Sequence, residues 1–221
     1  RMIMGKAFLN LRNDSSYFYL KSALNLSAAS KTGALDIQIL FWLSKISLAS
    51  FDYRQTVILL DSVVKLSSSE NNFEMLSVAF NEIGGIKDEL HDHENAKMMF
   101  DTAYKIAARH SLYKQMGAAL GNLARFETDN AQSVKMQKHA IELLKRSPAS
   151  ENAVAQLYIN IGTLLGDPDS AIEYYQAAIR TVDPQTSSDV VMVAYNNLAY
   201  SYADKKEYQS AENCLLIKGI P

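Results

Sequence analysis

A mostly small residue recurs along the chain at nearly constant distance, and this spacing limits the possible folds more than any other feature. The recurring position holds Ala23, Val63, Ala103, Ala140, Ala178 and Lys218, at intervals of 37 to 40 residues. Between these positions the apolar residues follow the helical period, and no segment has the two-residue alternation of a β-strand. A repeat of this length without strands predicts an all-α fold, an α-solenoid of stacked helix pairs.

Short polar breaks divide the chain into predicted helices that form about six antiparallel pairs. The breaks combine cap-type side chains or a proline, as at Ser147-Pro148 and Asp183-Pro184, which begin or end helices. The predicted helices are 2–12 with 15–30, 34–49 with 53–68, 71–89 with 93–109, 112–127 with 130–146, 150–165 with 168–181, and 187–204 with 207–218. We expect one repeat domain over residues 1–221, its pairs at about 1–31, 32–70, 71–110, 111–147, 148–183 and 184–221.

Two stretches carry a family resemblance. From Phe80 the chain reads FNEIGGIKDELHDHENAKMMFDTA, and from Tyr195 it reads YNNLAYSYADKKEYQSAENCL. On these residues the chain is identified as a member of the tetratricopeptide repeat (TPR) family, which implies a right-handed superhelix. Small residues such as Gly84 and Ala199 allow two helix axes to approach closely. Large residues such as Phe100 pack against the neighbouring helix pair. The pair length is similar to the long-repeat variants in kinesin light chain and in bacterial TPR sensor regulators.

The resemblance also implies a binding groove, because the first helix of each TPR pair lines the concave face. The residue immediately before the Leu-Gly or Leu-Ala slot then points into that groove, and the successive residues are Trp42, Glu82, Asn122, Asn160 and Asn197. An asparagine amide both donates and accepts hydrogen bonds, so a series of them can hold the main chain of an extended peptide. The alternative is that these asparagines bond to neighbouring helices or only follow the repeat consensus.

Other side chains are expected to face the same groove by helical spacing. They are Phe41, Lys45, Asn81, Asp88, Arg125, Gln156, Thr163, Asn196 and Tyr200. Arg125 is suited to a carboxylate, which guanidinium binds through two hydrogen bonds. Phe41 and Trp42 lie in one helical turn, and we expect at least one of them to pack against the first helix pair. The basic residues of a chaperone-tail carboxylate clamp are not present as a set.

Charge and motif content argue against several functions. The chain has 22 basic and 24 acidic residues and no run of five Lys or Arg, so we expect no nucleic-acid partner through this region. The longest apolar stretch, 37–43, is too short for a bilayer, and we expect no membrane contact. The segment 91–94 has too few fixed ligands for a metal. Gly84-Gly85 falls inside a predicted helix, which argues against a phosphate-binding loop. The lone Cys214 is interpreted as a packing residue in a reducing, cytoplasmic protein.

These observations favour a non-catalytic protein–protein interaction module, without cofactor or metal, that binds a peptide or protein segment on its concave face. One alternative is the effector-sensing regulatory domain of a larger bacterial transcription regulator or signalling kinase, because both chain ends look excised from a longer protein. Another alternative is a structural or self-assembly spacer. In that case Leu215-Leu216-Ile217 at the last helix would support a homodimer through exposed terminal helices.

Overall fold

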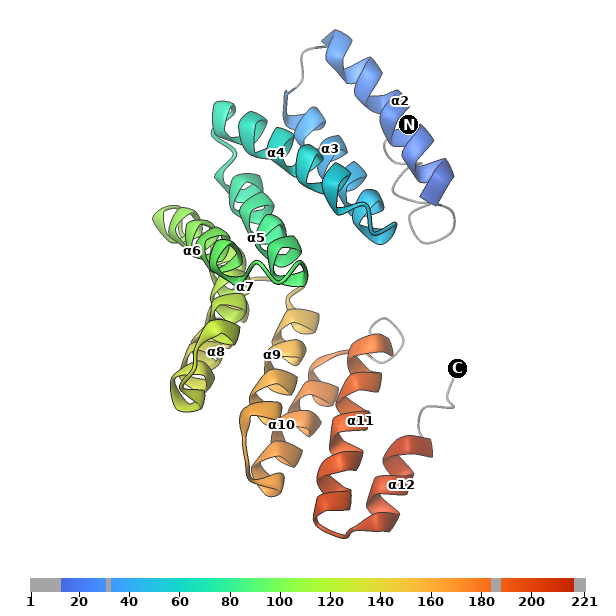
Figure 1. The fold of residues 1–221 in the computed structure, drawn as a ribbon, viewed down its shortest axis with the longest axis vertical. Helices are drawn as coiled ribbons and strands as arrows, with labels where there is room; N and C mark the ends of the chain where they lie inside the picture. Colours follow the sequence, from blue (N-terminus) through green and yellow to red (C-terminus); the bar gives the residue numbers. More distant parts are fainter. Residues whose placement is uncertain (1–12, 31–32, 184–187, 217–221) are drawn as a thin grey trace. The chain divides into compact units, whose positions relative to one another are not determined.

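The computed structural model describes residues 13–30, 33–183 and 188–216, which form α-helices and one short 3-10 helix, without a strand among them (Figure 1). The elements are α2 (Asn13–Ser30), α3 (Gly33–Ala49), α4 (Tyr53–Ser69), α5 (Phe73–Glu89), α6 (His93–Arg109), α7 (Tyr113–Leu123), η1 (Ala124–Phe126), α8 (Asn130–Leu144), α9 (Glu151–Leu164), α10 (Pro168–Thr181), α11 (Ser188–Asp204) and α12 (Tyr208–Leu216). The all-α prediction is confirmed. The predicted helix 2–12 and Lys218 lie outside the described residues.

The chain divides into two compact units, Arg1–Gln115 and Met116–Pro221. In the first unit, buried residues of α2 to α5 form one core, which includes Leu20, Ile37 and Leu60. In the second unit, α9 to α12 form another core around Tyr175 and Leu198. A single domain over 1–221 stays a prediction. Within the described part of the chain, no helix is both long enough and apolar enough to cross a bilayer.

The recurring small position is a packing position wherever the structure describes it. Ala23, Val63, Ala103, Ala140 and Ala178 are all buried, with at most 8% of their surface exposed. Gly84 of α5 is also a packing position without room for a side chain, because a Cβ there would lie 2.8 Å from the ring of Phe100 on α6. A Cβ on the neighbouring Gly85 would meet nothing within 4 Å. The prediction that one glycine of this pair is a packing residue inside a helix is therefore confirmed.

A three-residue turn repeats through the first unit and sets its helix spacing. Four turn residues have a positive φ: Phe51 (57°), Asn71 (55°), His91 (60°) and Ser111 (54°). The amide after each one bonds back into the helix, as from Asp52 to the carbonyl oxygen of Ser47 at 3.0 Å. This is the Schellman arrangement, which glycine usually completes. Residues other than glycine here adopt a left-handed conformation that costs about 1–2 kcal/mol.

Replacing Phe51 by glycine is expected to raise the free energy of unfolding by about 1 kcal/mol. Its φ of 57° is unfavourable for a bulky residue, and its side chain is 77% exposed, so little packing is lost. The matched control is Asn71→Gly, where the gain should be smaller because asparagine tolerates this conformation. Urea denaturation of both variants measures the difference. Equal effects at the two turns would contradict the explanation by strain.

The end of α7 departs from the sequence prediction. An α-helix was predicted through residue 127, but α7 ends at Leu123 and tightens into η1. The carbonyl oxygen of Ala124 accepts a 2.7 Å bond from the buried Ser133 hydroxyl of α8 and a 3.3 Å bond from the Glu127 amide. These bonds replace the α-helical bond of that carbonyl, which explains the early end. The approximate predicted end of α8, 146, lies two residues beyond the observed end at Leu144.

Candidate functional site

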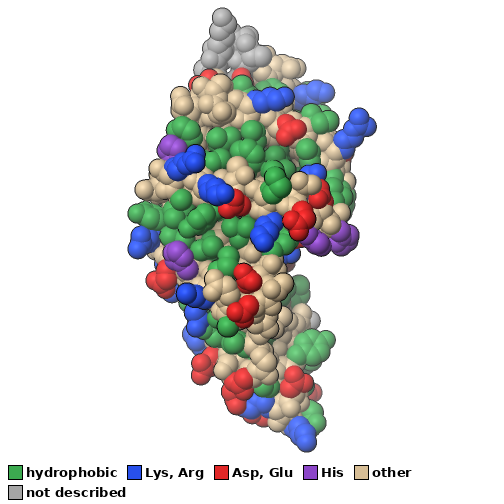
Figure 2. Space-filling view, turned by 60° about the vertical axis from the view of Figure 1, so that its left-hand side comes forward, with side chains coloured by type: hydrophobic (Ala, Val, Ile, Leu, Met, Phe, Trp, Pro, Cys, Tyr) green, Lys and Arg blue, Asp and Glu red, His purple; other side chains and the backbone are tan. Residues whose placement is uncertain are grey.

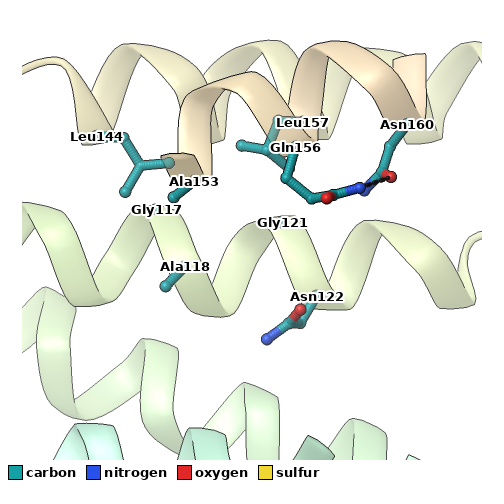
Figure 3. A pocket seen from close by; sticks show the side chains of 9 residues that line it. All are labelled: Gly117, Ala118, Gly121, Asn122, Leu144, Ala153, Gln156, Leu157 and Asn160. Carbon is teal, nitrogen blue, oxygen red and sulfur yellow. Dashed lines mark hydrogen bonds between the residues drawn. The ribbon is translucent and has the colours of Figure 1, made fainter. Parts of the chain in front are cut away.

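A cavity of about 160 Å³ lies between α7 and α9 in the second unit. Small residues and three amide side chains line it (Figure 3). The lining residues are Gly117, Ala118, Gly121, Asn122, Leu144, Ala153, Gln156, Leu157 and Asn160. Their spacing follows the helical period, with two glycines four residues apart on α7. The cavity therefore comes from adjacent faces of two first helices of consecutive pairs.

Glycines make this close packing feasible. A Cβ on Gly117 would lie 2.6 Å from Leu144 Cγ and 2.9 Å from the backbone oxygen of Ala140. A Cβ on Gly121 would lie 2.8 Å from Leu157 Cδ2. Larger residues at either position would push α7 away from its neighbours or fill the space beside α9. The small residues thus give the cavity a floor close to the main chain of α7.

Amide groups supply the polar chemistry of the cavity. Gln156 Nε2 donates a 3.1 Å hydrogen bond to Asn160 Oδ1, and the two side chains extend from α9 toward α7 (Figure 3). Asn122 lies on the side of α7 away from this pair (Figure 3). None of the described residues that line the cavity is ionisable. Such a surface can donate hydrogen bonds to carbonyl groups of a ligand and accept them from its amide groups, and the ligand needs no charge.

A second cavity of about 240 Å³ lies between the α9–α10 turn and α11. It is lined by Gly162, Thr163, Leu165, Gly166, Pro168, Ala171, Tyr175, Asn197, Tyr200, Ser201 and Asp204. Asn197, Ser201 and Asp204 are spaced by four and three residues, so they share one face of α11. Across from them the Tyr175 and Thr163 hydroxyl oxygens are 3.3 Å apart. This cavity is therefore more polar than the one between α7 and α9.

In the first unit, two predicted groove residues form an ion pair. Lys45 Nζ on α3 lies 2.8 Å from Glu82 Oε2 on α5, and 5.7 Å from the centre of the Phe41 ring. Phe41 and Trp42 are half-buried and pack against the core of that unit. The structure thus brings Lys45 and Glu82 together. That one of the two aromatic residues packs against the first helix pair stays a prediction.

The remaining predicted positions are dispersed. Asn122, Asn160 and Asn197 are half-buried, as are Asn81 and Asn196, and Tyr200 is 74% exposed. Arg125 is exposed on η1 and does not line the cavity beside Asn122, because the α-helix on which its position was predicted has already ended. Asp88 contacts His93, with 3.0 Å between Oδ1 and Nδ1. The peptide-binding role of these residues stays a prediction.

The histidines of the α5–α6 turn and Cys214, which in the sequence resemble metal or nucleophile residues, make packing contacts. His91 and His93 stack edge to face with their ring centres 5.9 Å apart at the α5–α6 turn. Within the described ranges, no group of three or more His, Cys, Asp or Glu side chains could hold a metal ion. Cys214 is 6% exposed, and burial raises the pKa of its thiol, which agrees with a packing role.

Sequence reasoning missed several cavity residues. Gly117 and Gly121 could have been found from their four-residue spacing on one predicted helix. Ser201 and Asp204 follow Asn197 at helical spacing, and that signal was also present in the sequence.

Figure 2 shows Lys and Arg side chains intermingled with Asp and Glu over the face that it draws. On that face the positive and negative side chains are not separated into patches.

Comparisons with known proteins agree on the fold. No family model matches the sequence, and no curated protein matches it. BtubC (BKLC) from P. vanneervenii has a TM-score of 0.69 and 19% identity, over 95% of this chain and 89% of that one. RapI in its apo form has a TM-score of 0.73 and 13% identity, over 98% and 80% of the two chains. NprR in complex with its cognate peptide NprX has a TM-score of 0.65 and 10% identity, over 98% and 64%. The fold of this chain is of the TPR helical-repeat type.

Proposed function

We propose that this chain is a non-catalytic interaction module that binds an extended peptide segment through amide side chains of the first helices in its second unit. The observation that carries the proposal is the cavity between α7 and α9, with a floor of small residues and the bonded amides of Gln156 and Asn160 at its rim. An extended peptide presents one donor and one acceptor per residue, which matches amides better than it matches charges.

The geometry of the rim supports recognition of a main chain. The bond from Gln156 to Asn160 uses one donor of Gln156 and the oxygen of Asn160, and it fixes both side chains in place. Fixing them before binding reduces the side-chain entropy lost when a peptide binds. The fold adds support, since NprR, of the same fold, was crystallised with a peptide. Asn197 on α11 extends the series to the next pair.

Asn160→Ala is expected to weaken peptide binding about threefold to tenfold, the loss of one hydrogen bond. Peptides are first selected from a random twelve-residue display library on the immobilised chain, then synthesised with a fluorophore and measured by anisotropy. The matched control is Asn152→Ala, on the same helix, exposed and outside the cavity lining. Failure to select any peptide, or equal affinities for the two variants, would contradict the proposal.

The same peptides should bind with nearly constant affinity between pH 5 and pH 8 when their own side chains do not titrate there. This follows because the lining of the α7–α9 cavity has no ionisable group. Anisotropy titrations at several pH values test it. A strong pH dependence of the affinity would place the binding elsewhere on the chain.

A further inference from the structure

The cavity between the α9–α10 turn and α11 differs from the amide-rimmed one in its charge. Asp204 supplies the one carboxylate among the described residues that line it, and Asn197 and Ser201 lie beside it on the same face of α11. Asp204 is exposed, at the last residue of α11. The opposite wall is closed by the Tyr175 ring, which takes the space above Gly162. The cavity thus has an apolar wall and a carboxylate on the α11 side.

The lysine that follows Asp204 in the chain is paired with other carboxylates. Lys205 follows Asp204 directly, but its ammonium group lies 2.6 Å from Asp169 Oδ1 and 2.8 Å from Glu207 Oε1. Lys206 is the other cation of this turn and is exposed. Lys205 therefore forms ion pairs with two other carboxylates and links α10 to the α11–α12 turn. A cationic group that enters the cavity meets Asp204 without competition from that ammonium.

Tyr200 provides the second feature of a guanidinium site. It lies four residues before Asp204, so both side chains project from the same face of α11, and its ring is 74% exposed. A guanidinium group pairs with a carboxylate through two bonds and stacks on an aromatic face, whereas an ammonium group does only part of this. The cavity therefore matches arginine better than lysine.

We propose that this cavity binds an arginine side chain of the partner segment, with Asp204 as the carboxylate and Tyr200 as the stacking ring. The inference rests on the proposed function, because it assigns the partner as a peptide that carries arginine. Asn197 and Ser201 then bond to the main chain or to the guanidinium edge of that arginine. The α7–α9 cavity holds uncharged main chain, and the α11 cavity fixes the register of the segment.

The test uses a titration of the isotope-labelled full chain followed by NMR. The probes are the capped pentapeptide acetyl-Gly-Gly-Arg-Gly-Gly-amide, its lysine counterpart, and its citrulline counterpart, which keeps the shape of arginine without the charge. Agmatine, a free amine with the same guanidinium group, separates a small cation from a peptide side chain. The arginine probe should give saturable shifts for amides of α11, with citrulline binding at least about fivefold more weakly and lysine in between.

Variants localise the interaction. Asp204→Asn and Tyr200→Ala change exposed residues, so both should fold, and each should weaken the arginine probe about threefold or more. Glu173→Gln is the matched control, an exposed carboxylate of α10 outside the cavity lining, and it should have no effect.

Four results would overturn the inference: no saturable shift, equal binding of arginine and citrulline, an unchanged Asp204→Asn variant, or agmatine binding as tightly as the peptide. Its failure is separable from that of the proposed function. Peptides selected by display can still depend on Asn160 when the arginine probe fails, and the arginine probe can still bind when display yields no peptide.

Discussion

Phe100→Ala is expected to lower the free energy of unfolding of the first unit by about 3–5 kcal/mol, the range for removing a fully buried aromatic side chain. Phe100 has 0% of its surface exposed and covers Gly84 of the facing helix. Alanine there would leave a cavity between α5 and α6, because these helices are also held apart by other buried side chains. Urea denaturation followed by circular dichroism gives the change.

Gly84→Ala tests the other side of the same contact. Its Cβ would lie 2.8 Å from the Phe100 ring, so the substitution should destabilise by about 1–3 kcal/mol. In the Phe100→Ala background the space is empty, and the same substitution should then be neutral or stabilising by up to about 1 kcal/mol through helix propensity. This sign change gives a large coupling energy in the double-mutant cycle.

Gly85→Ala is the control for this cycle, because it lies next in the same helix and a Cβ there meets nothing within 4 Å. It should stabilise by about 0.5–1 kcal/mol in both backgrounds. Additive effects of Gly84→Ala and Phe100→Ala would show that the two residues do not share the space that the structure assigns to them.

The helices were largely predictable from the sequence because their turns are chemically distinct and regularly spaced. The predicted helices 93–109 and 168–181 have the observed bounds of α6 and α10, and for α10 the N-terminal cap explains the start. Asp167 accepts bonds from the backbone and hydroxyl of Ser170, and the hydroxyl bond is the main cause that lowers the pKa of Asp167 below its usual value. Pro168 then fixes the first turn.

Other features had no local signal. Phe51 and His91 occupy left-handed positions where the sequence offers no glycine, so the turn geometry is imposed by the packing of the helices on either side. The end of α7 depends on a bond from Ser133, nine residues away from Ala124. The pairing of Lys45 with Glu82 spans 37 residues. These contacts are set by how one helix pair stacks on the next, which a repeat pattern leaves open.

The candidate site was also predictable only in part. Consensus spacing predicted the helix positions of Asn122, Asn160 and Asn197, and all three line a cavity. It did not separate the cavity between α7 and α9 from the one at α11, because that difference depends on Gly117, Gly121 and Asp204. The close packing beside the first cavity and the charge of the second are decided by residues outside the repeat consensus.

Gly117→Ala is expected to destabilise the second unit by about 1–3 kcal/mol, although glycine to alanine inside a helix ordinarily stabilises by up to about 1 kcal/mol. Its Cβ would meet Leu144 Cγ at 2.6 Å and the backbone oxygen of Ala140 at 2.9 Å. A side chain can rotate away, but the backbone of α8 can move only as a whole. Leu144→Ala should therefore fail to rescue Gly117→Ala, unlike the rescue expected for Gly84 by Phe100→Ala.

Thermal and urea denaturation of the single and double variants measure this difference, with Gly166→Ala as the control. A Cβ on Gly166 meets nothing within 4 Å, and its φ is not in the left-handed region, so this variant should be neutral or slightly stabilising. Because Gly117 also lines the α7–α9 cavity, Gly117→Ala should weaken the selected peptides while leaving the arginine probe at α11 unaffected. Full rescue by Leu144→Ala would show that α7 is set by side-chain packing alone. Persistence of the defect would place the limit in the close approach of the α7 and α8 backbones.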